Sequence, residues 1–119
     1  MKTKIMKINK FEDILSWQKS QTLNTAVFKL FESNKDYDFV RQIRRASVSI
    51  SNNIAEWFER QSNNEFKYFL FVAKGSCWEV RSMLYLAKNL GYIDDTMFQN
   101  LYQETVEISK LISWLIKTL

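Results

Sequence analysis

The sequence contains no histidine and no proline, and it has only two glycines, Gly75 and Gly91, and one cysteine, Cys77. A β-rich domain needs turn-forming residues at intervals of about ten positions, whereas a few long helices need almost none. The scarcity of proline and glycine therefore favours an all-α fold for these 119 residues. The single cysteine excludes a disulfide within one chain.

The missing histidine removes the commonest general base and the commonest metal ligand. Cys77 falls on the apolar side of its predicted helix, so we interpret it as a small core residue rather than a nucleophile. Glu56 with Glu59, and Glu104 with Glu107, have a spacing more typical of a salt-bridged helix surface than of an acid–base pair. No phosphate-binding glycine loop or dinucleotide motif is present. We therefore expect a protein that is not an enzyme and has no cofactor and no metal site.

Length and hydrophobic content predict one domain over residues 1–119, because 46% hydrophobic residues suffice for one packed core. The basic segment 1–10 precedes the first predicted helix, and we interpret it as a frayed tail or as a contact for phosphate groups. No stretch has the length and apolarity of a membrane span, and no signal-peptide pattern follows the first residues. We therefore expect a cytoplasmic protein without a membrane partner.

Hydrophobic periodicity and capping residues predict four helices, over about residues 12–31, 36–60, 65–90 and 95–119. The third helix follows Ser62 and Glu65, which are spaced as in a capping box, and Gly91 is a plausible stop for it. The second and fourth helices begin at aspartate caps, which are Asp36 or Asp38 and Asp94 or Asp95. Because the connections are short, neighbouring helices should be antiparallel, so the expected fold is an up-down four-helix bundle.

The third predicted helix carries more apolar side chains than one small bundle can bury. Its core stripe includes Leu70, Cys77 and Leu84 at helical spacing. A second set of large apolar and small residues surrounds much of the remaining surface: Tyr68, Phe71, Val72, Gly75, Trp78, Ser82, Tyr85 and Leu86. A large exposed apolar patch generally marks a contact site, so we interpret this set as a self-association interface. The alternative is a wide core with some exposed aromatic residues, which is common.

One edge of the same helix is basic, because Lys67, Lys74, Arg81 and Lys88 recur every seven residues. Such a ridge can track phosphate groups and give salt-dependent binding without sequence preference. The alternative is an ordinary solvated edge. The formal net charge of +4 permits nucleic-acid binding without requiring it.

The second predicted helix has two faces of different chemistry. Its apolar side consists of Ile43, Ala46, Ser47, Ile50, Ile54 and Trp57. Its polar stripe consists of Gln42, Arg45, Ser49, Asn53, Glu56 and Arg60. This stripe is mixed and rich in hydrogen-bonding groups, so we interpret it as a face that orders contacts within the bundle or between subunits.

Several motifs follow one order along the chain: Ile14-Leu15-Ser16-Trp17-Gln18, Gln42-Ile43-Arg44-Arg45-Ala46, Asn53-Ile54-Ala55-Glu56, Glu65-Phe66, Phe69-Leu70, Ala73-Lys74-Gly75-Ser76 and Leu90-Gly91-Tyr92-Ile93. With them, the chain resembles the four-helix-bundle proteins encoded in intervening sequences of bacterial 23S rRNA genes. The resemblance implies an antiparallel four-helix bundle that assembles as a ring-like homopentamer. It also implies kinship with the accessory variability determinant of diversity-generating retroelements, a basic pentamer that associates with a reverse transcriptase and nucleic acid.

The chain departs from the family pattern at three positions. Trp57 and Glu59 stand where the family usually has glycines, and Ser51 stands where it often has proline. Replacing glycine in a helix interior removes a cost of about 1 kcal/mol, so an unbroken second helix is expected here.

Two functional hypotheses follow. The first is a homo-oligomer that binds RNA or DNA, with Arg44, Arg45, Arg60 and the basic ridge as contacts for phosphates. In an alternative interpretation, Arg45 pairs with Glu56 of its own or another subunit. The second hypothesis is a structural or adaptor oligomer with a protein partner and no role in binding nucleic acid.

Overall fold

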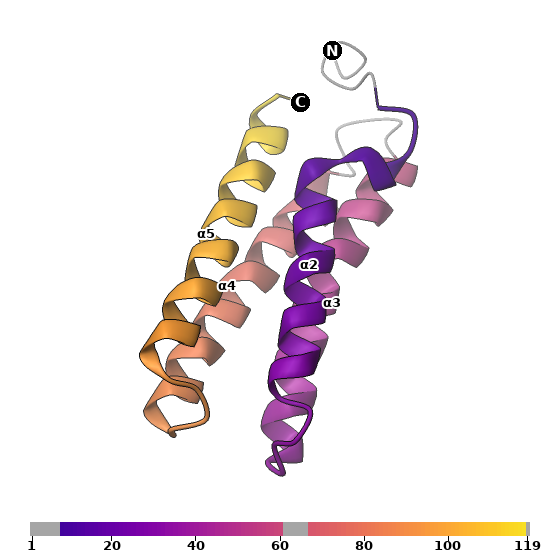
Figure 1. Cartoon of the computed structure of the whole chain (residues 1–119). Helices are drawn as coiled ribbons and strands as arrows, with labels where there is room; N and C mark the ends of the chain where they lie inside the picture. Colours follow the sequence, from indigo (N-terminus) through magenta and orange to yellow (C-terminus); the bar gives the residue numbers. More distant parts are fainter. Residues whose placement is uncertain (1–7, 61–66, 119) are drawn as a thin grey trace.

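The computed structural model describes residues 8–60 and 67–118, and in them it contains helices and no strand. A short 3-10 helix is followed by four long helices: η1 (Phe11–Asp13), α2 (Leu15–Leu30), α3 (Tyr37–Glu59), α4 (Lys67–Asn89) and α5 (Asp95–Lys117). Consecutive helices run in opposite directions and pack side by side, and α5 returns to α2 (Figure 1). The predicted all-α four-helix bundle is confirmed. The capping box predicted at 62–65 lies outside the described residues.

Aspartate caps set the starts of α3 and α5. The Asp36 carboxylate accepts a 3.2 Å hydrogen bond from the Phe39 backbone N–H, and the Asp94 carboxylate accepts one of 2.8 Å from the Met97 N–H. The other two candidate aspartates lie in the first turn of each helix, where a negative charge suits the positive end of the helix dipole. The first predicted helix is divided at Ile14, whose extended backbone separates η1 from α2.

Gly91 ends α4 as predicted. Its φ of +78° lies in the left-handed region, where an L side chain is strained. The Tyr92 N–H donates to the Ala87 carbonyl at 2.8 Å and the Gly91 N–H donates to the Lys88 carbonyl at 3.0 Å, which is the Schellman pattern of helix termination. The chain thus turns sharply and starts α5 antiparallel to α4.

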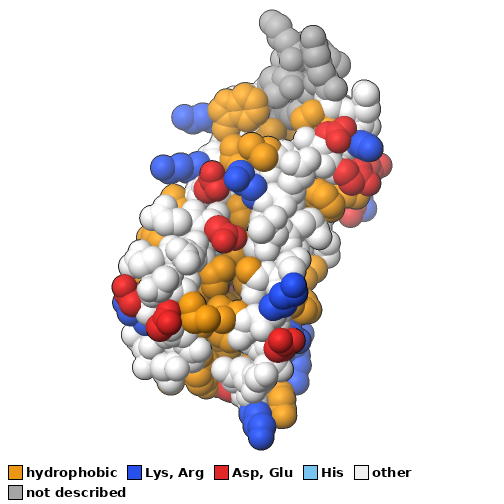
Figure 2. Space-filling model, in the orientation of Figure 1, with side chains coloured by type: hydrophobic (Ala, Val, Ile, Leu, Met, Phe, Trp, Pro, Cys, Tyr) orange, Lys and Arg blue, Asp and Glu red, His pale blue; other side chains and the backbone are white. Residues whose placement is uncertain are grey.

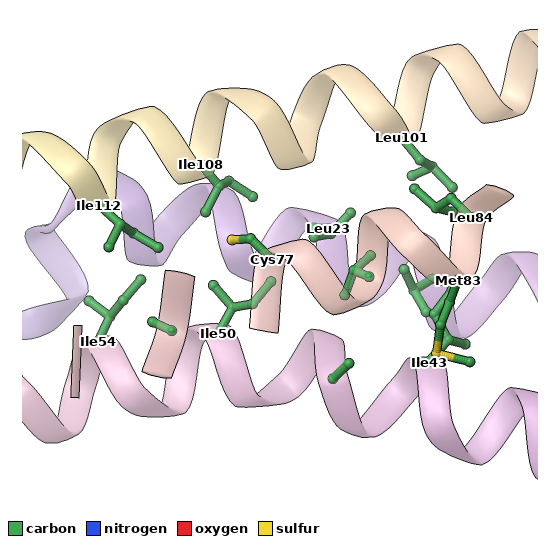
Figure 3. Packing of buried hydrophobic residues seen from close by; sticks show 14 of the residues in the cluster. Leu23, Ile43, Ile50, Ile54, Cys77, Met83, Leu84, Leu101, Ile108 and Ile112 are labelled. Atoms are coloured by element: carbon green, nitrogen blue, oxygen red, sulfur yellow. The ribbon is translucent and has the colours of Figure 1, made fainter. Parts of the chain in front are cut away.

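The core runs the length of the bundle and takes side chains from all four helices, which point into one interior (Figure 3). All six residues of the apolar side predicted for the second helix are buried, Trp57 completely. Since α3 continues unbroken to Glu59, the prediction made from the two missing family glycines is confirmed. On α4, the predicted core residues Leu70, Cys77 and Leu84 are fully buried as well.

One polar network lies inside this core, between α2 and α3. The Ser47 hydroxyl donates to the side-chain oxygen of Asn24 at 2.6 Å, and the Asn24 amide donates to the Ser51 hydroxyl at 3.1 Å. Ser51 in turn donates to the Val48 carbonyl at 3.2 Å. These buried groups therefore satisfy one another, which is the condition for keeping polar atoms in a core.

Candidate interaction surfaces

The face of α4 that points away from the core is strongly apolar. Five of its large side chains are between 45% and 65% exposed: Tyr68, Phe71, Trp78, Tyr85 and Leu86. Gly75 and Ser82 lie among them, and a Cβ added at Gly75 would meet nothing within 4 Å. Val72 is half-buried at the edge. Steps of three and four residues relate most of these positions, so they form a second seam opposite the core seam of the same helix.

Two of the four cations of the basic ridge of α4, Arg81 and Lys88, lie against α5. Lys88 pairs with Asp95 at 2.9 Å, and its ammonium also lies 4.9 Å from the centre of the Phe98 ring. The Arg81 guanidinium lies over the Tyr102 ring at 5.7 Å. Lys74 lies 5.6 Å from the Trp78 ring, while Lys67 forms no ion pair within the described residues. Cations stacked on rings keep their charge, so the ridge is a mixed basic and aromatic surface.

The three arginines proposed as phosphate contacts differ in their surroundings. Arg44 donates to the Phe28 carbonyl at 2.9 Å and lies 4.5 Å from the centre of the ring of that residue. Arg60 pairs with Glu56 at 2.5 Å. Arg45 is exposed and forms no ion pair within residues 8–60 and 67–118. Glu56 is thus paired with Arg60 rather than with the Arg45 of its own chain.

The polar stripe of α3 borders α4 and divides into two parts. Ser49 and Asn53 are half-buried: the Asn53 amide donates to the carbonyl and the hydroxyl of Ser49 at 2.8 and 3.0 Å. The Ser76 hydroxyl of α4 donates to the Ser49 hydroxyl at 2.9 Å. Gln42 and Arg45 are exposed. The middle of the stripe therefore connects α3 to α4, and one end of it faces solvent.

A groove between α2 and α5 was not predicted from the sequence. Along this seam the described residues line three hollows of about 260 Å³ each. Ala26, Leu30, Met97, Asn100, Leu101 and Glu104 line the first hollow. Lys19, Thr22, Glu104, Glu107 and Ile108 line the middle one. Ile8, Asp13, Ile14, Leu15, Ser16, Leu111, Trp114 and Leu115 line the third. Figure 2 looks onto this face and shows hydrophobic side chains between the two helices.

The middle hollow has an excess of negative charge. The Lys19 ammonium lies 3.2 Å from a Glu107 carboxylate oxygen, which leaves Glu104 without an ion pair among the described residues. Burial raises the pKa of Glu104, the charge of Glu107 raises it further, and the charge of Lys19 partly offsets both effects. The excess negative charge of Glu104 and Glu107 therefore favours the binding of a cation in this hollow.

Cys77, the other residue considered for chemistry, is buried in the core. Burial raises the pKa of its thiol to about 12, against a lowering effect of the Arg81 charge. The thiolate is the reactive form of cysteine, so this side chain is chemically quiet in the folded protein.

Comparison with known proteins assigns the chain to a family. Residues 12–114 match the 23S rRNA-intervening sequence proteins. The chain belongs to this family. A crystal structure of a protein of unknown function from the S23 ribosomal protein family of Bacteroides thetaiotaomicron VPI-5482 is 26% identical, with a TM-score of 0.80. The similarity covers 87% of this chain and 99% of that one. A comparison with curated proteins gave no match.

Membership in the 23S rRNA-intervening sequence family agrees with the resemblance found from the motifs, and it assigns no reaction. None of the helices in the described part of the chain is long and apolar enough to cross a membrane. Within residues 8–60 and 67–118, no group of three or more acidic or cysteine side chains is placed to hold a metal ion.

Proposed function

We propose that this 23S rRNA-intervening sequence protein is a non-enzymatic homo-oligomer that assembles through the outward face of α4. One observation carries the proposal: five large apolar side chains are exposed together on one helix face, interleaved with Gly75 and Ser82. Scattered apolar residues are normal on a protein surface, but a continuous patch of this kind marks a contact site. Small residues among the aromatic ones let another helix approach closely. The family resemblance gives five as the expected copy number.

The solution mass tests this proposal. Size-exclusion chromatography with light scattering should give a multiple of the 14.3 kDa chain mass. Trp78→Glu places a charge at the centre of the apolar face and should give the mass of one chain. Tyr37→Glu, at an exposed aromatic residue on α3, is the matched control and should keep the mass of the wild type. A wild type that has the mass of one chain at all concentrations would overturn the proposal.

A second candidate function is binding to the phosphate backbone of RNA or DNA. It is favoured by Arg45 and Lys67, which form no ion pair among the described residues, and by the cations of Arg81 and Lys88, which lie over α5 rings. In an oligomer these charges repeat with every copy, so affinity should depend strongly on salt. Kinship with the accessory variability determinant also supports it.

Filter binding with duplex and structured RNA tests this second function. Arg45→Ala combined with Lys67→Ala should weaken binding and reduce its salt dependence, whereas Lys29→Ala, at an exposed position on α2, should change little. An affinity that does not change with salt would exclude it. The remaining possibility is an adaptor for a protein partner, which would be favoured by partners that survive nuclease treatment in a pull-down.

A further inference from the structure

The three hollows of the α2–α5 groove repeat at the spacing of a heptad. The α5 residues that line them fall in the ranges 97–101, 104–108 and 111–115, with Glu104 shared by the first and middle hollows, so that the hollows recur about every seven residues. Seven residues of helix correspond to about 10.5 Å. On the outward face of α4, Phe71, Trp78 and Tyr85 also recur every seven residues. The aromatic side chains and the hollows therefore have the same spacing.

These two series also lie at the same heights along the bundle. The Tyr85 ring contacts the Phe98 and Tyr102 rings, with centroids 4.8 and 5.9 Å apart, which places Tyr85 level with the hollow at 97–101. Because α4 and α5 are antiparallel, seven residues back along α4 correspond to seven residues forward along α5. Trp78 is thus level with the hollow at 104–108, and Phe71 with the hollow at 111–115.

The chemistry of the two surfaces is complementary as well. The outer hollows are lined mainly by apolar side chains, while the middle one carries Glu104 and Glu107 against a single cation, Lys19. On α4, the middle aromatic residue is flanked at one turn on either side by Lys74 and Arg81. An α4 helix laid in this groove would bring two cations to the carboxylates.

We propose that the α4 helix of one copy docks in the α2–α5 groove of the next copy, with Phe71, Trp78 and Tyr85 in the three hollows. This inference rests on the proposed self-association through α4 and names the surface that receives it. The two surfaces differ, so the contact is head-to-tail and repeats from copy to copy. Because the matching groups lie at equal heights, copies stand side by side without a shift along the bundle axis.

A matched pair of variants tests the head-to-tail contact. Trp78 on α4 and Trp114 in the third hollow are 53% and 54% exposed, so the same change to glutamate can be made on each surface at little cost to the fold. Trp78→Glu and Trp114→Glu should each give single chains by light scattering. Mixed in equal amounts, the two variants should form a dimer of one copy of each. The intact α4 of the Trp114→Glu variant can dock in the intact groove of the Trp78→Glu variant, and the other two surfaces of the pair are blocked. Circular dichroism establishes that each variant is folded.

Each other outcome overturns the inference in a distinguishable way. If Trp114→Glu keeps the wild-type mass while Trp78→Glu dissociates, α4 mediates assembly but the groove does not receive it. If both dissociate and the mixture stays monomeric, the contact is symmetric rather than head-to-tail. A monomeric wild type overturns the proposed self-association too. Leu15→Glu, on the other wall of the third hollow and 50% exposed, replaces Trp114→Glu if that variant does not fold.

Discussion

The Tyr92 hydroxyl donates a 2.5 Å hydrogen bond to the Asp36 carboxylate, which ties the loop after α4 to the loop before α3. The other oxygen of Asp36 caps α3 through the Phe39 N–H, and the Tyr92 ring packs edge-on against the Phe39 ring at 5.2 Å. One carboxylate therefore holds a helix start and a distant loop together.

Substitutions at this pair should separate the two roles of Asp36. Asp36→Ala removes the cap and the tyrosine contact and should lower the free energy of unfolding by at least about 1 kcal/mol, as cap removal usually does. Asp36→Asn keeps a good cap and should cost less. Tyr92→Phe keeps the ring contact and should cost less than Asp36→Ala. Urea denaturation measures these differences, and an Asp36→Ala variant as stable as the wild type would contradict the assignment.

The buried network between α2 and α3 should be sensitive to single truncation. Asn24→Ala leaves the Ser47 hydroxyl without its acceptor and removes a donor from Ser51. A buried polar group that loses its partner costs about 1–3 kcal/mol, so the free energy of unfolding of this variant should be lower than that of the wild type by at least about 1 kcal/mol. Asn52→Ala, at an exposed position on α3, is the control and should stay within about 0.5 kcal/mol of the wild type in urea denaturation.

Gly75→Ala should have opposite effects on the single chain and on its assembly. In the chain alone the added Cβ meets nothing within 4 Å, and alanine is better than glycine in a helix interior by up to about 1 kcal/mol. Thermal unfolding in the Trp114→Glu background should therefore show a rise in stability. In the wild-type background the Cβ would stand between Phe71 and Trp78 and should weaken association measured by light scattering. Ser82→Ala changes little in size and should leave association unchanged.

The charge of Glu104 should oppose folding of the single chain at neutral pH. Its pKa is raised in the folded state by burial and by Glu107, with Lys19 acting in the opposite direction. A carboxyl group whose pKa is higher in the folded state than in the unfolded state contributes to stability at pH values below the pKa of the unfolded state. This contribution is lost as the pH rises through the pKa of the folded state. In a dissociated background, Glu104→Gln should therefore raise stability at pH 7 but not at pH 4. The gain should be within about 0.5 kcal/mol, because water still reaches the half-buried carboxylate.

In the assembled protein the same Glu104→Gln change should weaken association, since it removes the partner expected for Lys74 and Arg81 of the next copy. Glu59→Gln, at an exposed position on α3, is the control for both measurements. A Glu104→Gln variant that associates more tightly than the wild type would contradict the expected contact with cations.

Local patterns predicted most of the fold. Hydrophobic residues at helical spacing identified the buried sides of α3 and α4, and Gly91 identified the end of α4, because these signals lie within a few residues of one another. The surplus of aromatic residues on α4 could also be predicted from the sequence, because this helix carries more large apolar side chains than one bundle can bury.

Other features depend on packing between distant segments. Asn24 is a polar residue that a sequence pattern assigns to the surface, and its burial follows only from the serines that α3 places opposite it. The Tyr92–Asp36 bond joins residues far apart in the chain. The groove arises because α2 and α5, the first and last long helices, pack over fewer residues than α3 does with either of its neighbours.

The buried thiol of Cys77 gives the protein a built-in reporter. The side chain points into the core from the helix whose opposite face carries the exposed aromatic residues. Separation of the copies would leave it covered, while loss of the core would expose it to a thiol reagent. The rate of labelling of this single cysteine therefore distinguishes dissociation from unfolding without any engineered probe.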